Sequence, residues 1–206
     1  MADARDVVLG RIRAALADRP TAAPVPRDYD TSRDVQDVVG LFAERAADYR
    51  AVVRRVRPRE LAEEIDVSLR ARGARRMAAP DDLPAWWRIG EVVWSLDEPG
   101  HPLSIRALDR SDGVLTGCAV AIAETGTVVL DAGEAQGRRA LTLLPDYHLC
   151  VVRADQVVGT VPEALARLSP TSPLTFISGP SATSDIELDR VEGVHGPRNL
   201  EILIVN

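Results

Sequence analysis

Short apolar runs, most of them ended by Gly, Pro or Asp, recur along residues 51–206 and constrain the fold more than any other feature of the sequence. Runs of this length, rich in Val, Ile and Leu, are typical of buried β-strands. Helical patterns lie between several of them. Because strands that alternate with helices tend to pair in parallel, the sequence predicts an α/β fold with a mostly parallel sheet covered by helices.

The individual elements can be placed from these runs and from their breaks. We expect strands over residues 51–56, 75–79, 92–94, 115–123, 127–130, 140–144, 147–153, 174–177 and 200–205. Helices are expected over residues 58–72 and 161–168, the first of them ending at Gly73, a residue that favours the left-handed cap of a helix. The order of strand 51–56, helix 58–72 and strand 75–79 predicts parallel pairing with a right-handed crossover.

The N-terminal part of the chain has a different pattern. Residues 3–18 have apolar side chains at helical spacing, and three prolines between residues 20 and 26 then predict an extended linker to about Thr31. A second amphipathic helix is expected over residues 34–49. We therefore divide the chain into an N-terminal helical segment, 1–49, and an α/β domain, 50–206. The helix over 34–49 is expected to dock on this domain.

Charge and hydropathy exclude several classes of protein. All 25 basic residues are Arg, which excludes a Schiff-base lysine and a phosphate loop of the Walker A type. The net charge of −6 argues against general nucleic-acid binding. No apolar run reaches the roughly 20 residues that a membrane-spanning helix needs. The first residues lack the apolar core of a secretory signal, so the protein is expected to be cytoplasmic.

Cysteine and histidine are few and dispersed. Cys118 and Cys150 both lie in apolar runs, which predicts buried free thiols. His101, His148 and His195 are isolated and show no metal-binding spacing. We therefore expect neither a zinc site nor an iron–sulfur cluster within this chain.

The segment 123–127, AETGT, is the first candidate site. Glu124 follows a run of Ala, Val and Ile, although Glu is seldom buried without a partner. A carboxylate at the end of a strand can face a crevice and act as a base or a nucleophile, with Thr125 and Gly126 forming the turn beside it. The alternative is a hairpin corner whose Glu side chain points to water.

The segment 177–187, ISGPSATSDIE, is the second candidate site. A strand ends here and small hydroxyl residues lead to a capping box of Ser184 and Glu187, which predicts the start of a helix. Free N–H groups at such a start suit a phosphate or a carboxylate. The residues expected to bind a ligand are Thr125 and Gly126 of the first segment, together with Ser178, Gly179, Ser181, Thr183 and Asp185 of this one. The alternative is an ordinary capped turn.

A Gly- and Pro-containing turn before the last strand adds two charged or titratable groups. His195 could act as an acid, a base or a hydrogen-bond donor, and Arg198 could clamp a carboxylate. We expect the Glu124 turn and the loop 178–185 to face each other in one crevice, with His195 and Arg198 approaching from this turn.

Four segments in order resemble the LUD-domain family, and within it the lactate-utilisation protein C subgroup. They are AETGT (123–127), SGPSATSDIE (178–187), GVHGPRNL (193–200) and the terminal EILIVN, and the resemblance covers about residues 104–206. Ser184 stands where the family pattern has Ala. The resemblance implies a phosphosugar-isomerase/CoA-transferase-like (NagB/RpiA/CoA-transferase-like) fold.

The same resemblance implies a cytoplasmic subunit of a bacterial system that oxidises L-lactate to pyruvate. Its partners would be an iron–sulfur subunit of the LUD family and a Cys-rich subunit. Independently of the resemblance, the crevice is expected to bind a small carboxylate such as lactate, because Arg pairs bidentately with carboxylates. The extra C-terminal cysteines of the iron–sulfur subunit are absent from this chain. Two alternatives stay open: a non-catalytic assembly or regulatory subunit, and a CoA- or nucleotide-dependent transferase suggested by the fold alone.

Overall fold

The computed structural model describes residues 3–18, 23–183, 191–192 and 196–206. The chain divides into two compact units, Met1–Asp30 and Thr31–Asn206. The first contains helix α1 (Ala4–Ala15), whose start is capped by Asp3. Its apolar stripe is exposed to solvent and consists of Val7, Val8, Ile12 and, just after the helix, Leu16.

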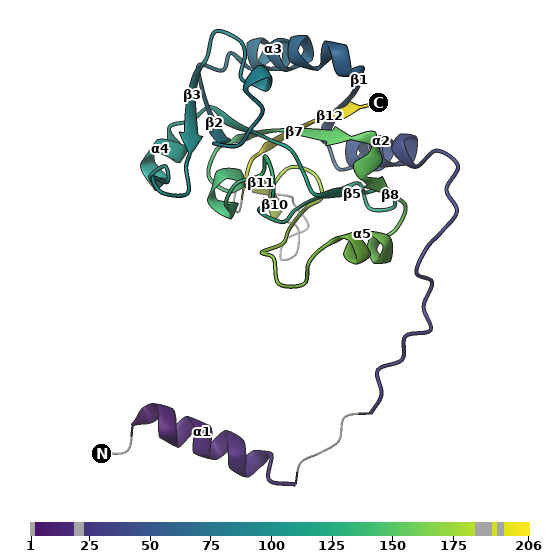
Figure 1. Cartoon of the computed structure of the whole chain (residues 1–206), viewed down its shortest axis with the longest axis vertical. Coiled ribbons are helices and arrows are strands. Elements are labelled where there is room, and N and C mark those ends of the chain that lie inside the picture. Colours follow the sequence, from purple (N-terminus) through teal and green to yellow (C-terminus); the bar gives the residue numbers. More distant parts are fainter. Residues whose placement is uncertain (1–2, 19–22, 184–190, 193–195) are drawn as a thin grey trace. The chain divides into compact units, whose positions relative to one another are not determined.

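A six-stranded parallel sheet forms the centre of the second unit (Figure 1). Its strands, in spatial order, are β1 (Val52–Val56), β12 (Asn199–Val205), β7 (Tyr147–Arg153), β4 (Gly113–Thr116), β2 (Arg76–Pro80) and β3 (Val93–Asp97). The predicted parallel sheet is thus confirmed. The direct pairing of the strands near residues 51–56 and 75–79 is wrong, because β12, β7 and β4 lie between β1 and β2.

A smaller mixed sheet packs beside the first. Its order is β8 (Val157–Val158), β5 (Val120–Ile122), β6 (Thr127–Leu130) and β9 (Thr175–Ile177). The single strand predicted over residues 115–123 is therefore two strands, β4 and β5, in different sheets. The chain leaves the large sheet at Gly117, whose N–H donates to the carbonyl of Ala135. A short antiparallel pair joins β10 (Ala182–Thr183) to β11 (Val191–Glu192).

Side chains that alternate along β7 and β12 point to opposite faces of the large sheet and build two separate core clusters. On one face, Leu149 and Leu203 pack against helix α3 (Leu61–Arg72), which follows the short helix η1 (Pro58–Glu60). Helix α3 ends at Gly73, with a φ of 62°, as predicted. On the other face, Cys150 and Ile202 pack in one cluster with side chains of the small sheet.

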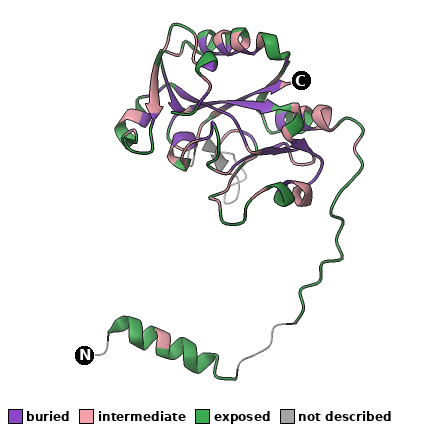
Figure 2. Ribbon diagram, viewed as in Figure 1, coloured by how far each residue is buried: buried purple, intermediate pink, exposed green. Residues whose placement is uncertain are grey.

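Helix α2 (Val38–Asp48) completes the second cluster with Phe42 and Ala46, both fully buried. The prediction that the helix near residues 34–49 docks on the domain is thus confirmed, and the boundary expected between residues 49 and 50 falls inside one compact unit. Figure 2 shows the buried residues concentrated in the strands and on the inner sides of these helices.

The remaining described elements are η2 (Ala85–Trp87), α4 (Ile105–Asp109), η3 (Arg139–Thr142), η4 (Ala154–Gln156) and α5 (Val161–Arg167). The strand predicted over 140–144 is wrong, because η3 replaces it and buries the adjacent residues Leu141 and Thr142 rather than alternate ones. The helix predicted to begin at Ser184 lies outside the described residues. No helix in the described part of the chain is both long and apolar enough to cross a membrane.

Candidate functional site

The AETGT segment forms the tight turn between β5 and β6. Gly126 has a φ of 60°, and a Cβ atom there would lie 2.5 Å from the backbone nitrogen of Ala46. Only glycine combines a left-handed backbone with so close an approach. The turn therefore packs against the last turns of α2, and its backbone is the hairpin corner that the sequence left open as an alternative.

Glu124 binds the start of a helix. Its Oε1 accepts a hydrogen bond from the N–H of Val161 at 3.0 Å, and Val161 is the first residue of α5. The N–H of Glu124 donates to the carbonyl of Gly159 at 3.0 Å. A carboxylate at a helix N-terminus satisfies a free N–H and interacts favourably with the helix dipole. This contact supplies a structural role for Glu124, and its role as a base stays a prediction.

Hydroxyl groups connect the turn with the second candidate segment. Thr125 Oγ1 and Thr127 Oγ1 are 2.7 Å apart, and Thr127 Oγ1 lies 2.7 Å from Ser178 Oγ. The Glu124 turn and the start of the loop after β9 are therefore in contact. They meet through these hydroxyls, whereas the Glu124 carboxylate binds the start of α5.

The loop after β9 is held from two sides. Gly179 has a φ of 81°, and a Cβ atom there would lie 2.4 Å from the carbonyl oxygen of Tyr49. The N–H of Ser181 donates to the carbonyl of Pro197 at 2.8 Å. These two contacts place the backbone of the loop between the end of α2 and the turn before β12. The loop then leads into β10, which contains Thr183.

Arg198 holds a carboxylate of its own chain. Its Nε and Nη2 donate to the two carboxylate oxygens of Asp146 at 2.6 and 3.0 Å. This bidentate pair joins the turn before β12 to the segment before β7. Asp185 and His195, the other charged or titratable residues expected in the site, lie outside the described residues.

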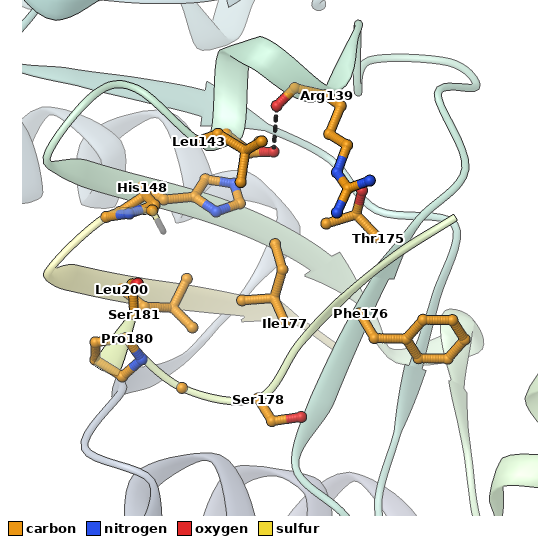
Figure 3. A pocket seen from close by; sticks show the side chains of 14 residues that line it. Arg139, Leu143, His148, Thr175, Phe176, Ile177, Ser178, Pro180, Ser181 and Leu200 are labelled. Carbon is orange, nitrogen blue, oxygen red and sulfur yellow. Dashed lines mark hydrogen bonds between the residues drawn. The ribbon is translucent and has the colours of Figure 1, made fainter. Parts of the chain in front are cut away.

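A cavity of about 280 Å³ opens between the two sheets, beside the predicted loop (Figure 3). It lies between η3, the first residues of β7 and β12, and the chain over residues 175–181. The lining consists of Arg139, Thr142, Leu143, His148, Thr175, Phe176, Ile177, Ser178, Gly179, Pro180, Ser181, Gly196, Pro197 and Leu200. Three predicted ligand-binding residues, Ser178, Gly179 and Ser181, are thus in this lining, whereas Glu124, Thr125, Gly126 and Arg198 are not.

His148 is the most unusual residue in this lining. It is 1% exposed, and its Nε2 lies 2.8 Å from Oγ1 of the fully buried Thr116. Its Nδ1 is buried without a hydrogen-bond partner among the described residues. A buried polar atom left unpaired costs about 1–3 kcal/mol. Such an atom on the wall of a cavity indicates a place where a ligand or water binds.

Arg139 supplies the charge of the cavity. Its side chain is exposed and extends toward Thr175 (Figure 3), and no ion pair of its guanidinium occurs within the described residues. No Asp or Glu belongs to the described lining. The adjacent Arg138, in contrast, binds Asp97 with two hydrogen bonds. A cavity whose described walls carry a cation and no acidic group favours an anion.

The local sequence does not mark His148 or Arg139 as a site residue. The sequence presents His148 as an isolated histidine, and Arg139 stands next to the run 140–144, for which a strand is predicted. One sequence feature does point to His148. In the apolar segment 148–152, HLCVV, only His148 and Cys150 have side chains that are not aliphatic. A polar ring at the start of a buried strand needs a partner or a function.

A second crevice lies at the carboxyl ends of β4 and β7, where ligands often bind in α/β sheets. It is lined by Cys118, Gln156, Arg153 and Arg167 among others. Both of these arginines already bind Asp155, Arg153 through the carboxylate and Arg167 through the backbone carbonyl. Its cations are thus occupied, which makes the cavity at His148 the better candidate.

The described residues offer no set of three or more His, Cys, Asp or Glu side chains that could hold a metal ion. Cys118 and Cys150 are buried free thiols, as predicted. The hydrogen bond with Cys150 and burial together raise the pKa of the Cys118 thiol. The candidate site of this chain is therefore built from hydroxyl, imidazole, guanidinium and backbone groups.

Known proteins similar to this chain point to one family. The LUD-domain family model matches residues 41–205. The chain is 46% identical to lactate utilization protein C of Deinococcus radiodurans over 99% of this chain and 96% of that protein. It is 30% identical to lactate utilization protein C of Bacillus licheniformis, over 58% of this chain and 53% of that protein.

A solved structure also resembles this chain. It is the crystal structure of a DUF162 family protein from Deinococcus radiodurans, which is 41% identical in sequence and superimposes with a TM-score of 0.70. The similarity covers 89% of this chain and 100% of that chain. The family match spans both sheets and the cavity between them, and this chain belongs to the LUD-domain family.

Proposed function

We propose that this protein is a cytoplasmic subunit of a bacterial L-lactate utilisation system, which oxidises lactate to pyruvate. The observation that carries the proposal is the similarity to lactate utilization protein C of Deinococcus radiodurans along nearly the whole of both chains. The cavity beside Arg139 and His148 supports it, because a small carboxylate matches a guanidinium in a described lining without acidic groups.

The proposed system needs further subunits for electron transfer. Lactate oxidation releases two electrons, and this chain has only two cysteines, far apart in sequence, rather than the ligand set of an iron–sulfur cluster. We infer that an iron–sulfur subunit of the LUD family and a Cys-rich subunit are its partners. We further assign the parallel sheet to the phosphosugar-isomerase/CoA-transferase-like architecture.

The catalytic residues within this proposal are those predicted from the sequence, Glu124 and His195. One observation favours a second candidate function, a non-catalytic assembly subunit: the Glu124 carboxylate already binds the N–H of Val161. In that case Glu124 would be structural, and the cavity would hold a ligand that regulates the complex.

Gene deletion tests the proposed function. A deletion strain should fail to grow on L-lactate as the sole carbon source and should grow normally on pyruvate. The wild-type gene should restore growth, whereas Arg139→Gln should restore it poorly because the carboxylate loses its cation. Arg106→Gln is the matched control, since Arg106 is an exposed arginine outside the cavity lining. Normal growth of the deletion strain on lactate would refute the proposal.

A further inference from the structure

We propose that His148 binds the hydroxyl group of the ligand, so that the cavity selects small 2-hydroxycarboxylates over carboxylates that lack the hydroxyl. This inference rests on the proposed function in one respect, the binding of a carboxylate in the cavity. It adds the residue that determines which carboxylate is bound.

The hydrogen-bonding state of the His148 ring is the first argument. The ring is buried, its Nε2 is held by Thr116 at 2.8 Å, and its Nδ1 has no partner in the part of the chain that the structure describes. Thr116 therefore fixes the ring orientation without using Nδ1. The unpaired nitrogen is buried, and it belongs to a residue of the cavity lining.

The choice of a hydroxyl follows from the chemistry of imidazole. In the neutral ring one nitrogen donates a hydrogen bond and the other accepts one. If Nε2–H donates to Thr116, Nδ1 accepts; if the Thr116 hydroxyl donates to Nε2, Nδ1–H donates. A ligand hydroxyl can pair with Nδ1 in both cases, because it is both a donor and an acceptor. A methylene group in the same position would leave Nδ1 buried and unpaired, at a cost.

The arrangement of the lining provides the second argument. Figure 3 shows the His148 ring and the Arg139 side chain on two sides of the cavity, with Leu143 and Ile177 between them. A cation for the carboxylate, a buried nitrogen for the hydroxyl and an apolar wall for a short alkyl group match the three parts of a small 2-hydroxycarboxylate. The volume of about 280 Å³ limits the ligand to a small molecule.

Calorimetric titration of the purified full-length chain with L-lactate and with propionate tests the inference. Propionate has the same carboxylate and carbon chain but no hydroxyl. The wild-type protein should bind L-lactate about tenfold more tightly than propionate, the effect of one buried polar group left unpaired. His148→Phe should remove this preference by weakening L-lactate binding about tenfold while changing propionate binding less than about twofold.

A second variant guards against a purely structural effect. His148→Asn keeps a hydrogen-bonding atom near the position of Nδ1 and should retain part of the preference for L-lactate. A loss of structure would weaken both ligands equally, whereas the inference requires a change in their ratio. Equal affinity of the wild-type protein for the two ligands would overturn the inference, as would equal weakening of both by His148→Phe.

The two proposals can fail separately. If the deletion strain cannot use lactate but the purified chain shows no preference for L-lactate, the proposed function stands and the inference about His148 is wrong. If the chain prefers L-lactate through His148 but the deletion strain grows normally on lactate, the inference stands and the proposed function is wrong.

Discussion

Two glycines of the predicted site segments lie close to the C-terminal end of helix α2. Gly126 approaches the backbone of Ala46, and Gly179 approaches the backbone of Tyr49, each in a left-handed conformation. A side chain at either position meets backbone atoms that cannot move away without displacing α2. The two glycines therefore allow the turn and the loop to pack closely against the C-terminal end of α2.

The first prediction concerns Gly126. Gly126→Ala should destabilise the protein by at least about 2 kcal/mol, because the strained φ and the clash with Ala46 both contribute. Gly73→Ala is the matched control: Gly73 has a φ of 62°, but a Cβ atom there would meet nothing within 4 Å, so only about 1 kcal/mol is expected. Urea unfolding measures both. Equal effects would show that the contact with α2 adds nothing.

The second prediction concerns Glu124. Glu124→Ala should cost about 1 kcal/mol, since the N–H of Val161 loses its acceptor, whereas Glu124→Gln keeps an oxygen for it and should cost less. Thermal unfolding measures this difference. Under the catalytic prediction, the Gln variant folds normally but does not support growth on lactate. Normal growth with that variant would contradict catalysis and favour the assembly subunit.

At the scale of elements, Glu163 fixes the corner between β8 and α5. Its carboxylate accepts hydrogen bonds from the N–H groups of Gly159, Thr160 and, across the chain, Arg33. Partial burial opposes its ionisation, but these N–H groups outweigh that effect and lower the pKa of Glu163. The ionised carboxylate thus joins the segment before α2 to the start of α5.

The third prediction follows from the sign of this shift. Because the folded-state pKa is below the unfolded value of about 4.5, Glu163 contributes stability above that pH. This contribution is lost as the pH falls through the folded-state pKa. Glu163→Gln should therefore be less stable than the wild type at pH 7 and equally stable in strong acid. Urea unfolding across this range checks it, and a pH-independent difference would contradict it.

The fourth prediction concerns the contribution of helix α2 to the stability of the domain. Deleting residues 1–49 removes the buried Phe42 and Ala46 and should cost several kcal/mol at about 25 cal/mol per Å² of apolar surface. Deleting residues 1–30, which keeps α2, is the matched control for the loss of these two buried side chains. An unchanged melting temperature after the longer deletion would show that α2 does not stabilise the domain.

Local signals predicted many elements of the whole molecule but not their arrangement. Strands 127–130 and 147–153 match β6 and β7, since each is a buried run bounded by turn residues. The insertion of β12 between β1 and β7 depends on contacts between distant segments. The local sequence pattern does not indicate which distant strands pair.

The candidate site, too, could be predicted only in part, because some of its features depend on contacts between distant segments. The hydroxyl contact between Thr127 and Ser178 agrees with the expected proximity of the two motifs. The partner of Glu124 is 37 residues away, and the unpaired state of His148 Nδ1 arises only when the sheets pack. Such features depend on the tertiary structure and not on local spacing.

The large sheet places a hydrogen-bond network on one face and the cavity on the other, at the adjacent residues Tyr147 and His148. Tyr147 and His148 point to opposite faces, and the Tyr147 hydroxyl donates to Oε2 of the buried Glu201 at 2.8 Å. Oε1 of Glu201 accepts from Ser68 and Arg54 at 2.9 and 2.7 Å. This network joins β1, β7, β12 and α3 on the face away from the cavity.

The last prediction tests this separation. Tyr147→Phe should cost about 1 kcal/mol, the usual value of one hydrogen bond, while Glu201→Ala should cost about 3 kcal/mol or more because it leaves the partly buried Arg54 without this partner. Urea unfolding measures both. Since the network faces α3, the folded Tyr147→Phe protein should keep the wild-type preference for L-lactate over propionate, whereas His148→Phe should lose it. A loss of preference in Tyr147→Phe would show that the two faces of the sheet are coupled, and that the orientation of His148 depends on the network behind it as well as on Thr116.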